Sequence, residues 1–206
     1  MKNSNVYEFD SEKEDFSSNN ENNEEESEEE EVKIDLNLLT SISNTLTKVL
    51  EETDKNIEIK QIIRNQKKMP FSSNTIPQIS LLDYLKRIQN YGGMENSTLI
   101  LSLIYIDRLC EKNVTLTKYN IHRILFTAIL IAVKYNEDSF YENNYYAQIA
   151  GIKNKELKVI EYTFLEMINF NAYIDEKTYY LYKESLENFN DNNNNNDNKN
   201  NNNNNS

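Results

Sequence analysis

Residues that commonly carry catalysis or bind metals are scarce in this chain of 206 residues. It has one histidine, His122, one cysteine, Cys110, and three glycines. A single cysteine allows no intrachain disulfide and no zinc cluster, and a single histidine leaves one candidate base for any nucleophile. The glycines, at positions 92, 93 and 151, do not build a GxGxxG or Walker loop. We therefore expect no metal, no cofactor and no enzymatic activity.

Two charged residues stand out because apolar residues surround them. Lys134 directly follows the apolar run 124–133, and Glu161 lies on the apolar face of a helix expected over 154–168. That face consists of Leu157, Ile160, Phe164, Leu165 and Ile168. A carboxylate buried without a partner costs several kcal/mol, so Glu161 needs one. Two interpretations remain open: an internal salt bridge between long side chains, or a polar pair at the rim of an apolar surface that a partner covers.

Other polar and reactive residues carry narrower hypotheses. Asp107 follows the apolar run 99–106 and is expected to be structural, holding helix ends together. Cys110 is expected to be a small core residue, and His122 a surface or capping residue at a helix start. Ser27 precedes three glutamates, which is the pattern of a phosphosite for an acid-preferring kinase. The plainer interpretation of that acidic run is a solvated tail.

Charge and composition divide the chain into three parts. Residues 1–31 carry thirteen acidic and two basic side chains, which account for −11 of the net charge of −12. We expect residues 1–33 to be an acidic disordered tail, 34–189 to be the folded domain, and 190–206 to be an asparagine-rich disordered tail. The body is almost neutral, so we expect no nucleic-acid partner, because phosphate binding needs a lysine and arginine excess.

The apolar spacing of the body predicts an all-α fold. Helices are expected over 36–50, 79–91, 98–109, 121–135, 144–150, 154–168 and 176–186, with caps at Asn96 or Ser97, at Thr117 and at Asp175. Two of them are apolar almost all round and should be enclosed by the others. The apolar runs fall short of the ~20 residues that cross a bilayer, so we expect no membrane partner. The first residues contain no secretory signal, which favours an intracellular location, in the nucleus, the cytoplasm or both.

The order of several short motifs resembles the cyclin box of the P/U-type cyclins, a group named for its phosphate-signalling members. The resemblance covers roughly residues 36–187, and its motifs keep their order and spacing: Phe71 with Pro77-Gln-Ile-Ser, Asp83-Tyr-Leu-Lys-Arg-Ile88, Tyr105-Ile-Asp-Arg108, His122-Arg with Ala132-Val-Lys134, Asn144-Tyr-Tyr-Ala, Gly151-Ile, Glu156-Leu, Ile160-Glu161, Phe164-Leu and Asn169-Phe. The resemblance implies a single cyclin box, with a five-helix core and flanking N- and C-terminal helices.

The resemblance also implies a partner, a cyclin-dependent protein kinase, and a role in its regulation. Family members bind the kinase backbone near its mobile C-helix through a lysine and a glutamate, and Lys134 and Glu161 stand at those positions. The apolar neighbours Phe164 and Leu165 are expected to add contact area. Asp107 matches a structural aspartate of the family.

Two departures from the cell-cycle cyclins limit what the resemblance implies. Gln78 replaces an arginine that those cyclins bury against the aspartate, so Gln78 is assigned a structural position, and Tyr84 replaces a tryptophan of their substrate-docking patch. The chain ends in asparagines where a second helical repeat would begin. The leading hypothesis is a kinase regulatory subunit. The alternatives are a cyclin-fold helical adaptor, or a transcription-associated relative, that binds no kinase.

Overall fold

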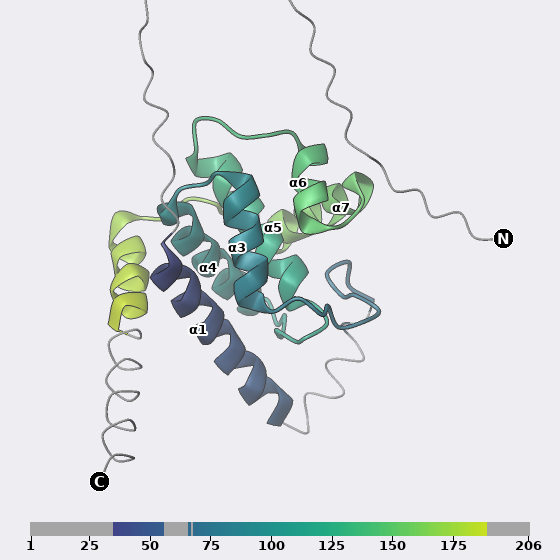
Figure 1. The fold of residues 1–206 in the computed structure, drawn as a ribbon, viewed down its shortest axis with the longest axis horizontal. Helices are drawn as coiled ribbons and strands as arrows, with labels where there is room; N and C mark the ends of the chain where they lie inside the picture. Colours follow the sequence, from purple (N-terminus) through teal and green to yellow (C-terminus); the bar gives the residue numbers. More distant parts are fainter. Residues whose placement is uncertain (1–34, 56–65, 67, 189–206) are drawn as a thin grey trace, which may run out of the picture. The chain divides into compact units, whose positions relative to one another are not determined.

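The structure is a computed structural model, and it describes residues 35–55, 66 and 68–188 (Figure 1). The acidic segment with Ser27 and the asparagine-rich segment lie outside this range, as do the predicted domain limits at 34 and 189. The described residues form helices joined by turns and loops, with no strand among them. The predicted all-α class is therefore confirmed.

Six labelled helices and one unlabelled C-terminal helix make up the described fold. They are α1 (Leu36–Lys55), α3 (Leu81–Gly92), α4 (Asn96–Cys110), α5 (Ile121–Asn136), α6 (Asn143–Ala150), α7 (Asn154–Met167) and the helix 176–188. Their positions agree with the apolar spacing. The ends differ from the prediction by one or two residues, except that α1 runs to Lys55, five residues past the predicted end at Leu50. Asp175 caps the C-terminal helix as predicted, since the Thr178 amide donates to its Oδ1 at 3.0 Å.

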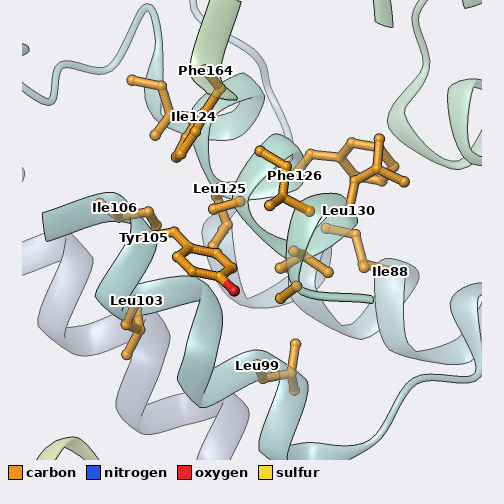
Figure 2. Packing of buried hydrophobic residues seen from close by; sticks show 14 of the residues in the cluster. Ile88, Leu99, Leu103, Tyr105, Ile106, Ile124, Leu125, Phe126, Leu130 and Phe164 are labelled. Atoms are coloured by element: carbon orange, nitrogen blue, oxygen red, sulfur yellow. The ribbon is translucent and has the colours of Figure 1, made fainter. Parts of the chain in front are cut away.

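The core is built around α4 and α5, which form the most extensive helix–helix contact of the described residues. Almost every residue from Thr98 to Ile106, and from Ile124 to Val133, is buried. Figure 2 shows Tyr105 of α4 beside Leu125 of α5, with Phe164 of α7 close to Ile124. α5 also contacts α3, α6 and α7, whereas α1 packs on α3. The prediction of two enclosed helices is confirmed.

The predicted N-terminal caps of α4 and α5 are wrong. Other residues occupy these cap positions. α4 begins after Glu95, and neither Asn96 nor Ser97 is its cap. Glu137, just beyond α5, accepts from the Glu95 amide at 3.1 Å and the Thr98 hydroxyl at 2.6 Å. Partial burial raises the pKa of this carboxyl. α5 begins after Asn120, whose Oδ1 accepts from the Thr117 amide at 2.8 Å.

The segment after α7 is tied to the last turns of α4. The Tyr105 hydroxyl donates to the Ala172 carbonyl at 2.7 Å, and the Arg108 guanidinium donates to the carbonyls of Asn171 and Tyr173. These bonds fix the chain just before the C-terminal helix, because both donors belong to the rigid core helix.

Asp107 holds the C-terminal helix but is not buried. Its Oδ2 accepts a 2.5 Å hydrogen bond from the Tyr182 hydroxyl, and its own side chain is exposed. This contact supports the structural role expected for Asp107. Gln78 is also exposed, and its amide reaches only the nearby Ile76 carbonyl, at 3.5 Å. This geometry contradicts a structural role for Gln78, because the C-terminal helix, not Gln78, supplies the partner of Asp107.

We predict that Tyr182→Phe destabilises the fold by about 1–2 kcal/mol, since it removes the hydroxyl and leaves the ring in place. Asp107→Ala should lower the free energy of unfolding by a similar amount. The loss of stability in the double variant should be smaller than the sum of the two single losses. Chemical denaturation of all three variants tests this coupling. Additive effects would show that the bond does not hold the helix.

Candidate functional site

Three helices bring Lys134, Glu161 and Asn143 together. Lys134 stands in the last turn of α5, Glu161 in the middle of α7, and Asn143 at the first residue of α6. The Lys134 ammonium lies 2.5 Å from Glu161 Oε1, and the Asn143 amide donates to Glu161 Oε2 at 3.0 Å. Each carboxylate oxygen of Glu161 therefore has one donor. The charge that interrupts the apolar stripe is paired.

The pair is internal, yet it is open to one side. The side chain of Lys134 is 25% exposed and that of Glu161 is 14% exposed. An ammonium has three donors and each carboxylate oxygen accepts more than one hydrogen bond, so both groups keep bonding capacity beyond their mutual contact. The salt bridge of the first interpretation is present, and it stands at an accessible rim, as the second interpretation requires.

Exposed aromatic residues adjoin the pair along the chain. Tyr135 follows Lys134, Tyr162 follows Glu161, and both are exposed. The Tyr162 ring meets the Phe170 ring edge-on, with centroids 6.2 Å apart, and 59% of Phe170 is exposed. Exposed aromatic side chains that contact one another, as Tyr162 and Phe170 do, are typical of a protein-binding surface.

Phe170 is held outward by a strained turn. Asn169 and Phe170 both adopt positive φ angles, 55° and 54°, a region that bulky side chains rarely enter. The turn closes through the Phe170 amide, which donates to the Leu165 carbonyl at 2.7 Å. Strain of this kind costs of order 1–3 kcal/mol and persists only where surrounding structure imposes it. The chain thus presents an aromatic ring to solvent against its own backbone preference.

One predicted contact residue is misplaced. Phe164 is completely buried and packs edge-on against Phe71, with ring centroids 6.0 Å apart. Phe164 packs on the core side of α7 and has no exposed surface that a partner could contact. Its assignment as a kinase-contact residue is therefore wrong. Its neighbour Leu165 is partly exposed and packs at the edge of the core. The two adjacent residues share the apolar stripe, but the stripe is wider than the part that the core covers.

The sequence prediction missed Asn143, Tyr162 and Phe170. Tyr162 and Phe170 could have been found from the sequence, because an aromatic residue on the polar face of an amphipathic helix, or just after it, needs a cover. Asn143 gave no such signal, since a polar residue at a helix start is ordinary.

The described residues offer little reactive chemistry. No group of three or more histidine, cysteine, aspartate or glutamate side chains within them could hold a metal ion. Burial raises the pKa of the Cys110 thiol to about 11, and His122 Nε2 lies 3.0 Å from the Ile79 carbonyl with its pKa lowered by burial. Within the same residues, no helix is both long enough and apolar enough to cross a membrane.

Comparison with known proteins identifies the class. The cyclin family model matches residues 13–172, which is most of the chain, so the chain belongs to the cyclin family. Cyclin-U4-2 of Arabidopsis thaliana is 32% identical over 154 residues, 73% of this chain and 70% of that protein. Cyclin-U2-1 of the same plant is 35% identical over 57% of this chain and 54% of its own length. PHO85 cyclin-7 of Saccharomyces cerevisiae is 28% identical over 74% of this chain and 60% of that protein. Within the family, the chain is thus of the P/U type with a single cyclin domain, as its motifs suggested.

We predict that Phe164→Ala lowers stability by about 3–5 kcal/mol, because it empties a core position. Leu165→Ala should cost well under half as much, since part of that side chain is already in water. Urea unfolding of the two variants measures the difference. Equal losses would contradict the division of this stripe into a covered and an uncovered part.

Proposed function

We propose that the chain is a cyclin-type regulatory subunit, not an enzyme, that binds a cyclin-dependent protein kinase and activates it by holding its C-helix. The observation that carries the proposal is the Lys134–Glu161 pair, open at a rim between α5, α6 and α7, with an exposed tyrosine next to each member in the sequence. Membership of the cyclin family and the similarity to PHO85 cyclin-7 of Saccharomyces cerevisiae support this role.

The proposed mechanism needs only positioning. In an active kinase, a lysine of the small lobe pairs with a glutamate of the C-helix, and both must be in place for phosphoryl transfer. A rigid surface that binds the C-helix in its inward position shifts the kinase toward that state. α5 and α7 are rigid because their inner faces belong to the core, so groups fixed to their outer edges keep their geometry on binding.

Each part of the rim has a distinct task in this proposal. The spare donors of Lys134 and the spare lone pairs of Glu161 bind backbone carbonyl and amide groups of the kinase. Asn143 holds the carboxylate in place from the second oxygen. Tyr162, Leu165 and Phe170 supply the apolar contact area. Regulatory interfaces of this kind often bury more than about 2,000 Å² in total, so the polar pair fixes orientation more than it supplies area.

We predict that Lys134→Ala and Glu161→Ala each weaken kinase binding about 30-fold or more, because truncating one member strands the other and the kinase groups it would bind. Full-length variants are tested by co-purification of the endogenous kinase and by its activity on a peptide substrate. Lys155→Ala and Glu166→Ala serve as matched controls, since both side chains are exposed on α7. Melting temperatures are measured on the same samples.

The salt bridge alone predicts a different pattern. If the pair were only structural, both variants would lose binding in proportion to unfolding, and kinase capture at a temperature well below melting would match the controls. Intact capture and activation with both residues replaced by alanine would refute the site.

We predict that Phe170→Gly separates stability from binding. Glycine tolerates the positive φ angle, so the melting temperature should stay level or rise, while kinase binding should fall about tenfold with the loss of the ring. The control is Tyr180→Ala, which removes an exposed aromatic ring from the C-terminal helix. Alanine is used there because glycine would destabilise a helix. Unchanged kinase binding in Phe170→Gly would remove Phe170 from the surface.

A further inference from the structure

Ser139 lies on the exposed loop that joins α5 to α6 (Figure 1). The loop comprises residues 137–142, none of which is helical, and residues 138–142 are all exposed. The backbone is extended at both ends of the loop, with φ −98° and ψ 142° at Glu137 and φ −69° and ψ 154° at Glu142. Neither the hydroxyl nor the amide of Ser139 is hydrogen bonded to another described residue. The hydroxyl is therefore accessible to a modifying enzyme.

Acidic residues flank Ser139 on both sides. Glu137 and Asp138 precede it, and Glu142 follows three positions later. Kinases that select acidic substrates recognise such carboxylates by charge complementarity. In an extended segment, positions i and i+3 lie about 10 Å apart, so the acceptor hydroxyl and the following carboxylate can enter separate subsites of a kinase. The acidic pattern noted at Ser27 thus recurs within the part of the chain that the structure describes.

Two other serine or threonine residues of the described chain have an acid three positions later, and the structure argues against both. Ser80 caps α3, since its hydroxyl donates to Asp83 Oδ2 at 2.7 Å and accepts from the Asp83 amide at 3.0 Å. Thr163 precedes Glu166 but is partly buried in the middle of α7. In a helix, positions i and i+3 lie about 5–6 Å apart on one face, and the backbone is already paired. Of the three, Ser139 alone has an unpaired hydroxyl on an extended and exposed segment.

The loop borders the rim of the proposed kinase site. Lys134 stands five residues before Ser139, and Asn143 stands four residues after it. Glu137 ties the loop to the start of α4 through two hydrogen bonds. A phosphoserine carries a charge of about −1.5 to −2 at pH 7. At position 139 this charge lies two residues from Glu137, which is within the Debye length of about 8 Å at physiological salt.

We propose that Ser139 is a phosphorylation site for an acid-directed serine/threonine kinase, and that its phosphate weakens partner binding at the Lys134–Glu161 rim. The modifying kinase transfers the γ-phosphoryl group of ATP to Ser139 Oγ. The bond from phosphorus to Oγ forms, the bond from phosphorus to the ADP oxygen breaks, and the hydroxyl proton passes to the catalytic aspartate of the modifying kinase. The second half of this inference rests on the proposed function. A partner must either remove water from the dianion beside the rim or leave part of the rim uncovered, and both lower affinity.

The first test uses the full chain, ATP and purified casein kinase II, an acid-directed enzyme. Peptide mass spectrometry follows the phosphate on each site over time. We expect Ser139 to be phosphorylated at least about tenfold faster than Ser80 or Thr163 in the same molecules, because those two need local unfolding first. A synthetic peptide of residues 134–147 provides the same motif without the fold.

Three results of this test would overturn the proposal. If Ser80 or Thr163 is modified as fast as Ser139, the selection by exposure and extended backbone is wrong. If the peptide is modified and Ser139 in the chain is not, the loop is not accessible to the kinase. If the peptide itself stays unmodified, the acidic motif is not a substrate.

The second test compares the phosphorylated chain with Ser139→Ala taken through the same reaction. Phosphate added at Ser27 is common to both chains, so the comparison isolates position 139. Kinase capture is measured as above, with phosphatase inhibitors present, and melting temperatures are recorded in parallel. We expect the phosphorylated chain to capture the kinase at least about fivefold more weakly than Ser139→Ala. Untreated chain and untreated Ser139→Ala should capture it equally, because the exposed serine makes no contact of its own.

Lys134→Ala separates this inference from the proposed function. If Lys134→Ala loses kinase capture while full phosphate occupancy at Ser139 leaves capture unchanged or tighter, the regulatory half of the inference is refuted and the proposed function stands. If neither Lys134→Ala nor the phosphate changes capture, the kinase site itself is refuted.

Discussion

The burial of α4 and α5 is the constraint on which the rest of this molecule depends. Both helices are apolar on nearly every side, so neither is stable in water until other helices enclose it. The remaining helices supply that enclosure, and each needs only one apolar stripe to do so. The site then arises where enclosure stops: Lys134 is the first charged residue after the buried stretch of α5, and Glu161 meets it from the edge of a covering helix.

Enclosing two helices also creates a demand for hydrogen bonds at their ends, and long-range partners meet it. Glu137 serves the start of α4, while Tyr105 and Arg108 of α4 serve the carbonyls after α7. Because backbone groups away from water must be paired, these contacts decide where the connecting segments run. The strained turn at Phe170 is one consequence, since Arg108 and Tyr105 fix the residues that follow it and leave the ring outside.

The positions of the helices could be predicted from the sequence. Their caps, and which residues at the margins of their apolar faces are buried, could not. Apolar spacing located every described helix to within a few residues, because the spacing reflects which side must be buried. It did not separate Phe164 from Leu165, since both lie on the stripe and the burial of Phe164 depends on core residues distant in sequence, such as Phe71. The cap at Glu137 and the bond from Asn143 depend on residues distant in sequence, and local pattern carries no information about them. The pairing of Lys134 with Glu161 could be anticipated, because each was a charge without a local partner.

The last turn of α4 carries two attachments of the chain that follows α7. Asp107 binds Tyr182 of the C-terminal helix, while Arg108, the next residue, binds the backbone on either side of Ala172, close to Phe170. A helical turn inside a packed core moves as a unit, so these two attachments share one rigid support. Substitutions in this turn therefore disturb the C-terminal helix and the Phe170 turn at once. Substitutions at exposed positions such as Ser139, Tyr162 and Phe170 leave that support intact, and for this reason they are the ones that can test what the surface binds.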